Sequence, residues 1–269
     1  MTGTGGPRVL VHAGFHKTGT TSLQNFLHRN RKALGPHFAY YGKADFLQAG
    51  ANARIYGQKP FPWRMAAFRR SLRRFLATVP DGRDIVLSRE TFSGGMPGHR
   101  TWRGALMTAY APAARPLARA ILAEVTRRFP DAEISFLYTT RARDPWLASV
   151  HGHLLRSIKL TQDLDTFLAA QSATPGPEAE AATMAELLDV PVHIARLEDL
   201  GGHPFGPAKA VLDIMGVPGG VRRNLSPAFR ANTGQAADLK STFLALNRGG
   251  LTGAALKHAK EAAIAEASQ

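Results

Sequence analysis

Residues 8–30, RVLVHAGFHKTGTTSLQNFLHRN, constrain the fold more than any other part of the sequence. They begin with a short apolar run, VLV, of the kind that forms a buried strand. A tight polar loop, GFHKTGTT, follows at residues 14–21. From Ser22 onward apolar residues recur at helical spacing, with polar residues between them. The segment therefore predicts a strand, a glycine-containing loop and a helix over residues 22–30, in direct succession.

This arrangement is typical of a binding site for a phosphate or sulfate group. The N-terminus of a helix presents unpaired N–H groups and the positive end of the helix dipole. The glycines let the backbone approach an oxygen atom closely, and the hydroxyls and the Lys17 ammonium supply further donors. The residues that we expect to contact the anion are Gly14, His16, Lys17, Thr18, Gly19, Thr20, Thr21 and Ser22.

The order of residues in this loop differs from that of the Walker A motif. In GxxxxGK(S/T) the lysine follows the second glycine, whereas here Lys17 precedes Gly19 and the hydroxyls come after it. The pattern KTGTT after a strand resembles the loop of sulfotransferases that use 3′-phosphoadenosine 5′-phosphosulfate as donor. This resemblance implies that the loop binds the 5′-phosphate and sulfate end of the donor. It also implies that Lys17 stabilises charge on the bridging oxygen as the sulfuryl group leaves.

A second anion site is predicted around Arg141. Residues 133–140, EISFLYTT, predict a strand that leads into Arg141, and Ser149 lies eight residues later on the helix that follows. A guanidinium at the strand end and a hydroxyl on the helix can therefore converge on one phosphate. The resemblance to sulfotransferases implies that Arg141 and Ser149 bind the 3′-phosphate of the donor. Arg143 is also available, but we prefer Arg141 because we expect Arg143 to pair with Asp144.

Glu90 is the first candidate for a catalytic base. Residues 84–88, DIVLS, predict a buried strand, and Glu90 follows at its carboxyl end, where open α/β sheets bind ligands. An acceptor hydroxyl or amine must lose a proton as it attacks sulfur, and a nearby carboxylate accepts such a proton. The glutamate is similar to the base of many bacterial and glycan sulfotransferases. His16 is the second choice, and the alternative roles for Glu90 are to cap a helix near Thr91 or to pair with Arg89.

Strands alternate with helices along the chain, which predicts an α/β fold with a mostly parallel sheet flanked by helices in three layers. With the resemblance above, the expected architecture is the P-loop NTPase-like sulfotransferase fold. The expected strands are residues 8–13, 38–41, 84–88, 133–140 and 191–195. The other expected helices are residues 62–78, 112–129, a helix from 145, 161–171, 178–188, 207–215, 239–246 and 254–267. No repeat or long linker is present, so residues 1–269 are expected to form a single sulfotransferase-like domain, with helices in residues 236–269 packing on it or extending from it.

Two segments without a clear period, residues 38–61 and 94–110, are expected to build the acceptor pocket. They carry no motif, so the sequence does not identify the acceptor or the oligomeric state. Residues 62–78 predict an amphipathic helix. Four arginines lie beside its apolar stripe, Arg69, Arg70, Arg73 and Arg74, and we interpret them as an exposed basic surface rather than a polyanion-binding face.

The composition limits the classes of partner. The chain has 34 Lys and Arg against 20 Asp and Glu, a net charge of +14, which favours an anionic partner such as a nucleotide. It has no cysteine, which excludes disulfides and thiolate metal sites, and we expect no metal cofactor. No apolar run reaches about 18 residues, and the start MTGTGGPR lacks the apolar core of a secretory signal. We therefore expect a cytoplasmic enzyme without a membrane span.

The C-terminal third carries weaker signals. RLEDL at residues 196–200, followed by a helix and Gly-Val-Pro at 216–218, is similar to a block found in sulfotransferases, and we expect Glu198 and Asp199 to be structural. The basic KGxxG loop of that family is absent. The remaining candidates for donor contacts in this region are Arg222, Arg223 and Arg230.

Two other functions fit parts of the sequence. A nucleotide-dependent phosphotransferase needs Mg²⁺ and usually an aspartate at a strand end, and neither residues 84–88 nor 133–140 end in Asp. A non-catalytic protein that binds an anionic glycan or nucleic acid would interleave arginines with exposed aromatic residues. Trp63 and Trp102 lie near arginines, although both also suit packing. Nucleic acid is the less favoured partner.

Overall fold

The structure is a computed structural model that describes residues 6–228 and 237–267. Its centre is a five-stranded sheet with the order β2-β3-β1-β4-β5, and every neighbouring pair of strands is parallel. The strands are β1 (Arg8–His12), β2 (Ala39–Tyr41), β3 (Ile85–Ser88), β4 (Glu133–Thr140) and β5 (Val192–Arg196). The predicted α/β class, with a parallel sheet between helical layers, is confirmed.

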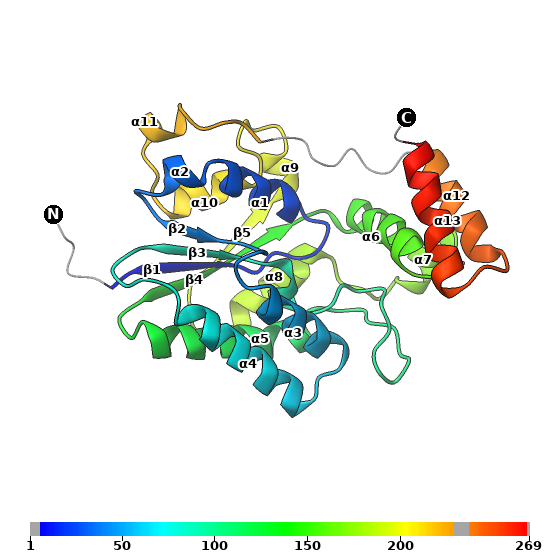
Figure 1. Cartoon of the computed structure of the whole chain (residues 1–269), viewed down its shortest axis with the longest axis horizontal. Helices are drawn as coiled ribbons and strands as arrows, with labels where there is room; N and C mark the ends of the chain where they lie inside the picture. The colour runs from blue at the N-terminus through cyan, green and yellow to red at the C-terminus, as the bar shows by residue number, and fades with distance from the viewer. Residues whose placement is uncertain (1–5, 229–236, 268–269) are drawn as a thin grey trace.

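Helices cover both faces of the sheet (Figure 1). One layer contains α1 (Thr20–Arg29), α2 (Arg31–Leu34), α9 (Leu197–Leu200), α10 (Ala208–Ile214) and α11 (Gly219–Arg222). The opposite layer contains α3 (Leu47–Gln58), α4 (Pro62–Leu76), α5 (Ala111–Arg128) and α8 (Pro177–Leu187). Because successive strand residues point to opposite faces, Val9 and Val11 of β1 pack into the core under the second layer, and Leu10 packs into the core under the first.

The connections of the sheet diverge between β1 and β4. β1 leads to β2 at one edge, whereas its neighbour β4 leads to β5 at the opposite edge. Open α/β sheets bind ligands at such a point, outside the carboxyl ends of the strands. Beyond these carboxyl ends lie α6 (Arg143–Ser157), α7 (Leu164–Ala170), α12 (Ala237–Arg248) and α13 (Gly253–Glu266) (Figure 1).

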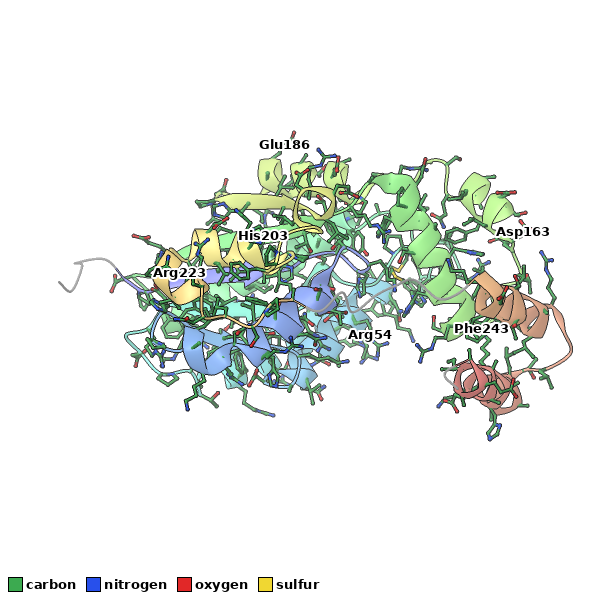
Figure 2. The ribbon with its side chains drawn as sticks, turned by 90° about the horizontal axis from the view of Figure 1, so that it is seen from above. Arg54, Asp163, Glu186, His203, Arg223 and Phe243 are labelled. Carbon is green, nitrogen blue, oxygen red and sulfur yellow. The ribbon has the colours of Figure 1, made fainter. Side chains whose placement is uncertain are left out.

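The α12–α13 pair is anchored on the C-terminal end of α6. The Asn247 amide donates to the carbonyl of Leu155 over 3.0 Å, and the Lys260 ammonium donates to the carbonyls of Leu155 and Ile158 over 2.6 and 2.8 Å. Phe243 is fully buried, and Figure 2 shows it on the side of α12 that faces α6. These contacts hold the pair beside the carboxyl end of the sheet. No helix within the described ranges is long and apolar enough to cross a membrane.

The helix α3 is a difference from the sequence prediction, which expected irregular structure after residues 38–41. Its buried positions are Ala49, Gly50, Ala53 and Gly57. These small residues allow close packing but give almost no hydrophobic periodicity, so the usual helical signal is weak. The helix matters for function because it runs along the segment that was expected to line the acceptor pocket.

The arginines of α4 are not all free surface charges. Glu124 of α5 has no exposed surface, and its carboxylate accepts hydrogen bonds from Arg69, Arg73 and Arg127 over 2.9 to 3.1 Å. Hydrogen bonds from Arg73 above all, assisted by those from Arg69 and Arg127, lower the pKa of Glu124 to about 2. Arg69 and Arg73, two of the four arginines beside the apolar stripe of α4, therefore join this helix to α5, which corrects the interpretation of all four as exposed basic surface.

We expect Glu124→Gln to reduce the free energy of unfolding by about 1.5–3 kcal/mol, the usual contribution of hydrogen bonds to a charged group. The lowered pKa means that this stabilisation is complete above the ordinary value of 4.5 and is lost as pH falls toward about 2. Urea unfolding at pH 7 and at pH 3 measures both effects. Asp81→Asn is the matched control, because Asp81 forms an exposed pair with Arg128 and its loss should cost at most about 1 kcal/mol. Equal costs for the two variants would contradict the structural role of Glu124.

Candidate active site

The loop after β1 adopts a strained backbone at Lys17. Lys17 has φ 69°, and among the described residues it is the one non-glycine residue with positive φ. Gly19 has φ 88° and is the N-cap of α1, whose first-turn N–H groups have no helical acceptors. A side chain held in the left-handed region costs of order 1 kcal/mol or more, and such strain is concentrated at binding and catalytic sites. The surrounding contacts must therefore hold the loop in this shape.

A buried chain of hydrogen bonds supports the loop from below. His12 lies between the Ser88 hydroxyl at 2.7 Å and the Thr139 hydroxyl at 3.3 Å. The Thr18 hydroxyl contacts that of Thr139 at 2.9 Å and donates to the carbonyl of Phe15 over 2.7 Å. The Thr18 hydroxyl therefore points inward, contrary to our prediction that it binds the anion. What Thr18 offers to a ligand is its backbone N–H.

Gly14 is packed tightly against the supporting hydrogen-bond chain. A Cβ atom at this position would lie 2.4 Å from the Thr139 hydroxyl and 2.5 Å from His12 Nε2. The supporting hydrogen-bond chain therefore requires a glycine at this position. Of the next three hydroxyl residues, Thr20 is buried, Thr21 is exposed and Ser22 is half-buried.

Four cationic side chains from four elements gather around this loop. Burial first, and then the charges of Arg141, Arg156 and Lys240, lower the pKa of Lys17. Arg141 follows β4, Arg156 lies on α6, and Lys240 lies on α12. Within the described part of the chain, none of the four forms an ion pair. The uncompensated positive charge makes this end of the sheet a candidate binding site for an anion.

The structure decides between the two arginines of the second predicted site. Arg143 donates to the carbonyls of Thr174 and Gln171 over 2.9 and 2.8 Å, and it pairs with Asp144 at 2.8 Å. The predicted local pair of Arg143 and Asp144 is therefore confirmed. Arg141 has no such protein partners among the described residues, so its guanidinium remains available for a ligand.

One face of α6 continues from this arginine toward the C-terminal helices. Ser149, His153 and Arg156 are spaced by four and three residues, so they lie on the same side of the helix. Partial burial, followed by the charges of Lys17, His99 and Arg156, lowers the pKa of His153 to about 4. The imidazole is neutral at neutral pH, and it separates the Ser149 hydroxyl from the Arg156 guanidinium along the helix.

Glu90 is the first residue of a short 3-10 helix, η1 (Glu90–Ser93), at the carboxyl end of β3. The Gln24 amide of α1 donates to its carboxylate over 3.2 Å, and Arg89 instead donates to the Thr91 hydroxyl over 3.0 Å. Burial raises the pKa of Glu90, but His16, the backbone N–H, Arg89 and Gln24 outweigh burial and lower it overall. Glu90 is thus a carboxylate at neutral pH, and it does not form the alternative ion pair with Arg89.

His16 is held rigidly beside this carboxylate. The Trp146 indole donates to the carbonyl of His16 over 2.9 Å, and the Tyr110 hydroxyl contacts both the backbone N–H and Nδ1 of His16 at 3.2 and 3.3 Å. Glu180 in turn accepts a hydrogen bond from the backbone N–H of Tyr110 over 2.8 Å. Burial lowers the pKa of His16 to about 4, although Glu90 opposes the shift. At neutral pH the site therefore pairs a neutral imidazole with a carboxylate.

Of the late candidates for donor contacts, the two that the structure describes, Arg222 and Arg223, do not join this site. Arg222 donates to the carbonyls of Val217 and Leu212, over 2.7 and 2.8 Å, and pairs with Asp213, so it fixes the end of α10. Figure 2 shows Arg223 at the end of the molecule away from α6 and α12. Arg230 lies outside the described residues. The expectation for Arg222 is wrong because its guanidinium is engaged at the end of α10, and that for Arg223 is wrong because the residue lies at the other end of the molecule.

Sequence reasoning missed two of the four cations. Arg156 lies seven residues after Ser149, or two helical turns, so the sequence places it on the same face of the helix. Lys240 carries no sequence signal, because it reaches the site only through the packing of α12 on α6. The predicted structural role of Glu198 is confirmed, since its carboxylate accepts a hydrogen bond from the backbone N–H of Ala142 over 2.9 Å, next to Arg141.

Three aromatic rings form an exposed cluster away from the loop. Phe61 stacks on Trp63 with ring centroids 4.5 Å apart and contacts Trp102 at 5.1 Å. Trp63 is 61% exposed and Trp102 is 48% exposed, and the Arg103 guanidinium lies 4.8 Å from the Trp102 ring centroid. These tryptophans are therefore surface residues, not packing residues.

Comparisons with known proteins assign no family. No protein-family model matches the sequence, and a search of curated proteins finds no match. The described residues contain no group of three or more His, Asp or Glu side chains arranged to hold a metal ion. The function must therefore be inferred from the residues of the site.

Proposed function

We propose that this chain is a sulfotransferase that moves a sulfuryl group from 3′-phosphoadenosine 5′-phosphosulfate to a hydroxyl or amine of a small molecule or glycan. The observation that carries the proposal is the group of four cations, none ion-paired within the described ranges, beside a carboxylate that is ionised at neutral pH. The donor carries phosphate at two ends of its ribose and therefore needs two anion sites. The KTGTT loop and Arg141 supply them on either side of the point where the sheet connections diverge.

The residues present fit this donor. The first-turn N–H groups of α1, together with the hydroxyls of Thr21 and Ser22, would hold the 5′-phosphate at the positive end of the helix. Arg141 and Ser149 would hold the 3′-phosphate. Arg156 and Lys240 lie near enough to Lys17 to affect its pKa and would add positive charge around the same nucleotide. No described residue offers a carboxylate ion pair to this group, so binding the donor displaces no internal partner.

The transfer is an in-line displacement at sulfur. A bond forms between the acceptor oxygen or nitrogen and sulfur, and the bond from sulfur to the bridging oxygen of the 5′-phosphate breaks. Glu90 accepts the proton of the acceptor, and Gln24 orients its carboxylate through the hydrogen bond at 3.2 Å. Lys17 stabilises the negative charge that develops on the bridging oxygen. The products are a sulfated acceptor and 3′-phosphoadenosine 5′-phosphate.

The experiment that tests the proposal compares two neighbouring arginines. We expect Arg141→Ala to weaken the binding of 3′-phosphoadenosine 5′-phosphate by roughly 10- to 150-fold, the loss expected for about 1.5–3 kcal/mol of charge-assisted hydrogen bonding. Isothermal titration calorimetry measures this affinity. With 5′-AMP, which has no 3′-phosphate, the same substitution should have little effect.

Arg143→Ala is the matched control for this experiment. Arg143 lies two residues further along, but its guanidinium binds backbone carbonyls of residues 171–174. We expect this variant to unfold at a lower urea concentration and, once folded, to bind the nucleotide as tightly as the parent. If Arg143→Ala weakens nucleotide binding and Arg141→Ala does not, the assignment of the 3′-phosphate site is wrong.

The exposed aromatic cluster favours a second candidate, a non-catalytic protein that binds an anionic polymer. Stacked aromatic rings beside Arg103 are what such a surface requires. Binding of heparin that is tight, falls steeply with salt, and is unchanged by Lys17→Ala but lost in Trp102→Ala would support this candidate over the enzyme.

A further inference from the structure

Arg89 is a buried cation that the reaction above does not use. It is 6% exposed, and its described partners are neutral: it donates to the Thr91 hydroxyl over 3.0 Å and to the carbonyl of Lys43 over 3.5 Å. No carboxylate among the described residues lies within ion-pair distance of it. Buried charges are normally paired. An unpaired guanidinium beside the catalytic carboxylate therefore indicates that an anion approaches this position.

The helix α3 is shaped around this guanidinium. A Cβ atom on Gly50 would lie 2.3 Å from Arg89 Nε, 2.6 Å from Cζ and 2.7 Å from Nη2, so only a glycine allows the side chain to rest there. Arg54 comes one helical turn after Gly50 and so lies on the same side of α3. Arg54 is exposed and has no ion pair in the described part of the chain.

The charge of Arg54 also acts on two residues near Glu90 and His16. Burial above all lowers the pKa of Arg89; the Glu90 charge opposes this shift and the Arg54 charge adds to it. Burial and then the Arg54 charge lower the pKa of His99. His99 in turn affects the pKa of His16. Figure 2 shows Arg54 at the end of the molecular body that faces α12, which is the end where the strands terminate. The Arg54 charge therefore acts on Arg89, the residue next to Glu90, and on His99.

We propose that the acceptor itself carries an anionic group, a carboxylate, sulfate or phosphate, which Arg89 and Arg54 bind while its hydroxyl or amine meets Glu90. The inference rests on the proposed function for the role of Glu90. One carboxylate, Glu90, faces two guanidiniums, so a net positive charge remains to be neutralised. With a neutral acceptor, Glu90 would be the one carboxylate that offsets the two arginines, whereas an anionic acceptor adds a second negative charge and places its nucleophile at a fixed distance from that charge.

The test uses a pair of probes that differ in charge and hardly in shape, 4-hydroxybenzoate and 4-hydroxybenzamide. Each is titrated at pH 7.5 into the full chain, with and without 3′-phosphoadenosine 5′-phosphate, while the Nε–H signal of Arg89 is followed by ¹⁵N–¹H NMR. We expect saturable shifts with 4-hydroxybenzoate and at least roughly tenfold weaker binding of 4-hydroxybenzamide, since one charge-assisted contact is lost. Arg54→Gln should reduce this ratio to within about threefold.

Arg70→Gln is the control, because Arg70 is an exposed arginine of the neighbouring helix α4. It should keep the ratio of the parent. Equal binding of the two probes, no movement of the Arg89 signal with either probe, or an unchanged ratio in Arg54→Gln would each overturn the proposal. Nucleotide affinity is measured on the same samples. If the parent protein does not bind the nucleotide, the proposed sulfotransferase function is refuted. The probe titration without nucleotide still measures binding at Arg89 and Arg54, so the two proposals fail independently.

Discussion

Replacing Lys17 with alanine is expected to lower sulfuryl transfer by at least about 10²–10³-fold, which corresponds to about 2.7–4 kcal/mol of lost charge stabilisation. Lysine and alanine both carry a Cβ atom, so the cost of the positive φ at this position is similar in the two proteins. The loop should therefore keep its shape, and the loss reports the ammonium group. Initial rates with a labelled donor and the best acceptor from a screen measure the effect.

Lys257→Ala is the control for this loss. Lys257 is an exposed residue of α13 whose nearest carboxylate, Glu261, lies 3.8 Å away, and we expect its removal to leave the rate unchanged. Transfer by Lys17→Ala within threefold of the parent would refute the catalytic role of the lysine. A loss that appears only in nucleotide affinity, with an unchanged maximal rate, would limit Lys17 to binding the donor.

Replacing Glu90 with glutamine should lower the maximal rate by about 10²–10⁴-fold, the usual contribution of a positioned base. Glutamine keeps an oxygen that accepts the hydrogen bond from Gln24, but it cannot take the proton of the acceptor. His16→Asn is the comparison, because His16 is the second candidate for the base. A larger loss in His16→Asn than in Glu90→Gln would reverse the assignment.

The pH dependence follows from the same pKa directions. Glu90 is active as the carboxylate, and its pKa lies below the ordinary value, so the rate should be flat between about pH 5 and 8 and fall only below about pH 4.5. An exposed histidine base would instead give a fall near pH 6.5. A flat profile would therefore exclude a histidine base with an ordinary pKa. It would not separate Glu90 from His16, because the pKa of His16 is also low, at about 4. The two substitutions make that distinction.

The parts of the fold that rest on strong local patterns were predictable from the sequence. Runs of β-branched and apolar residues predict β1, β3 and β4. The spacing of Arg141 and Ser149 corresponds to a strand end followed by two helical turns. The helix α3 was not predictable by periodicity, because small residues form its buried side. Those small residues are what allow Arg89 to rest against it.

The direction and partners of individual side chains in the site were less predictable than the strands and helices that carry them. A hydroxyl in a KTGTT loop looks the same in sequence whether it faces a ligand or a neighbouring strand, and the Thr18 hydroxyl turns inward only because Thr139 lies beneath it. Arg69 and Arg73 look like surface charges because their partner, Glu124, is on another helix. Lys240 joins the cations through packing at the end of the chain, which no local pattern encodes.

The central claim is that one end of the sheet binds a nucleotide with two separate phosphate sites and without a metal ion. Calorimetric titration of the full chain with 3′-phosphoadenosine 5′-phosphate, with 5′-AMP and with ATP·Mg²⁺ tests this claim most directly. We expect the bisphosphate to bind in the micromolar range, and both AMP and ATP·Mg²⁺ to bind far more weakly. Tight binding of ATP·Mg²⁺ without binding of the bisphosphate would contradict the claim and indicate a phosphotransferase.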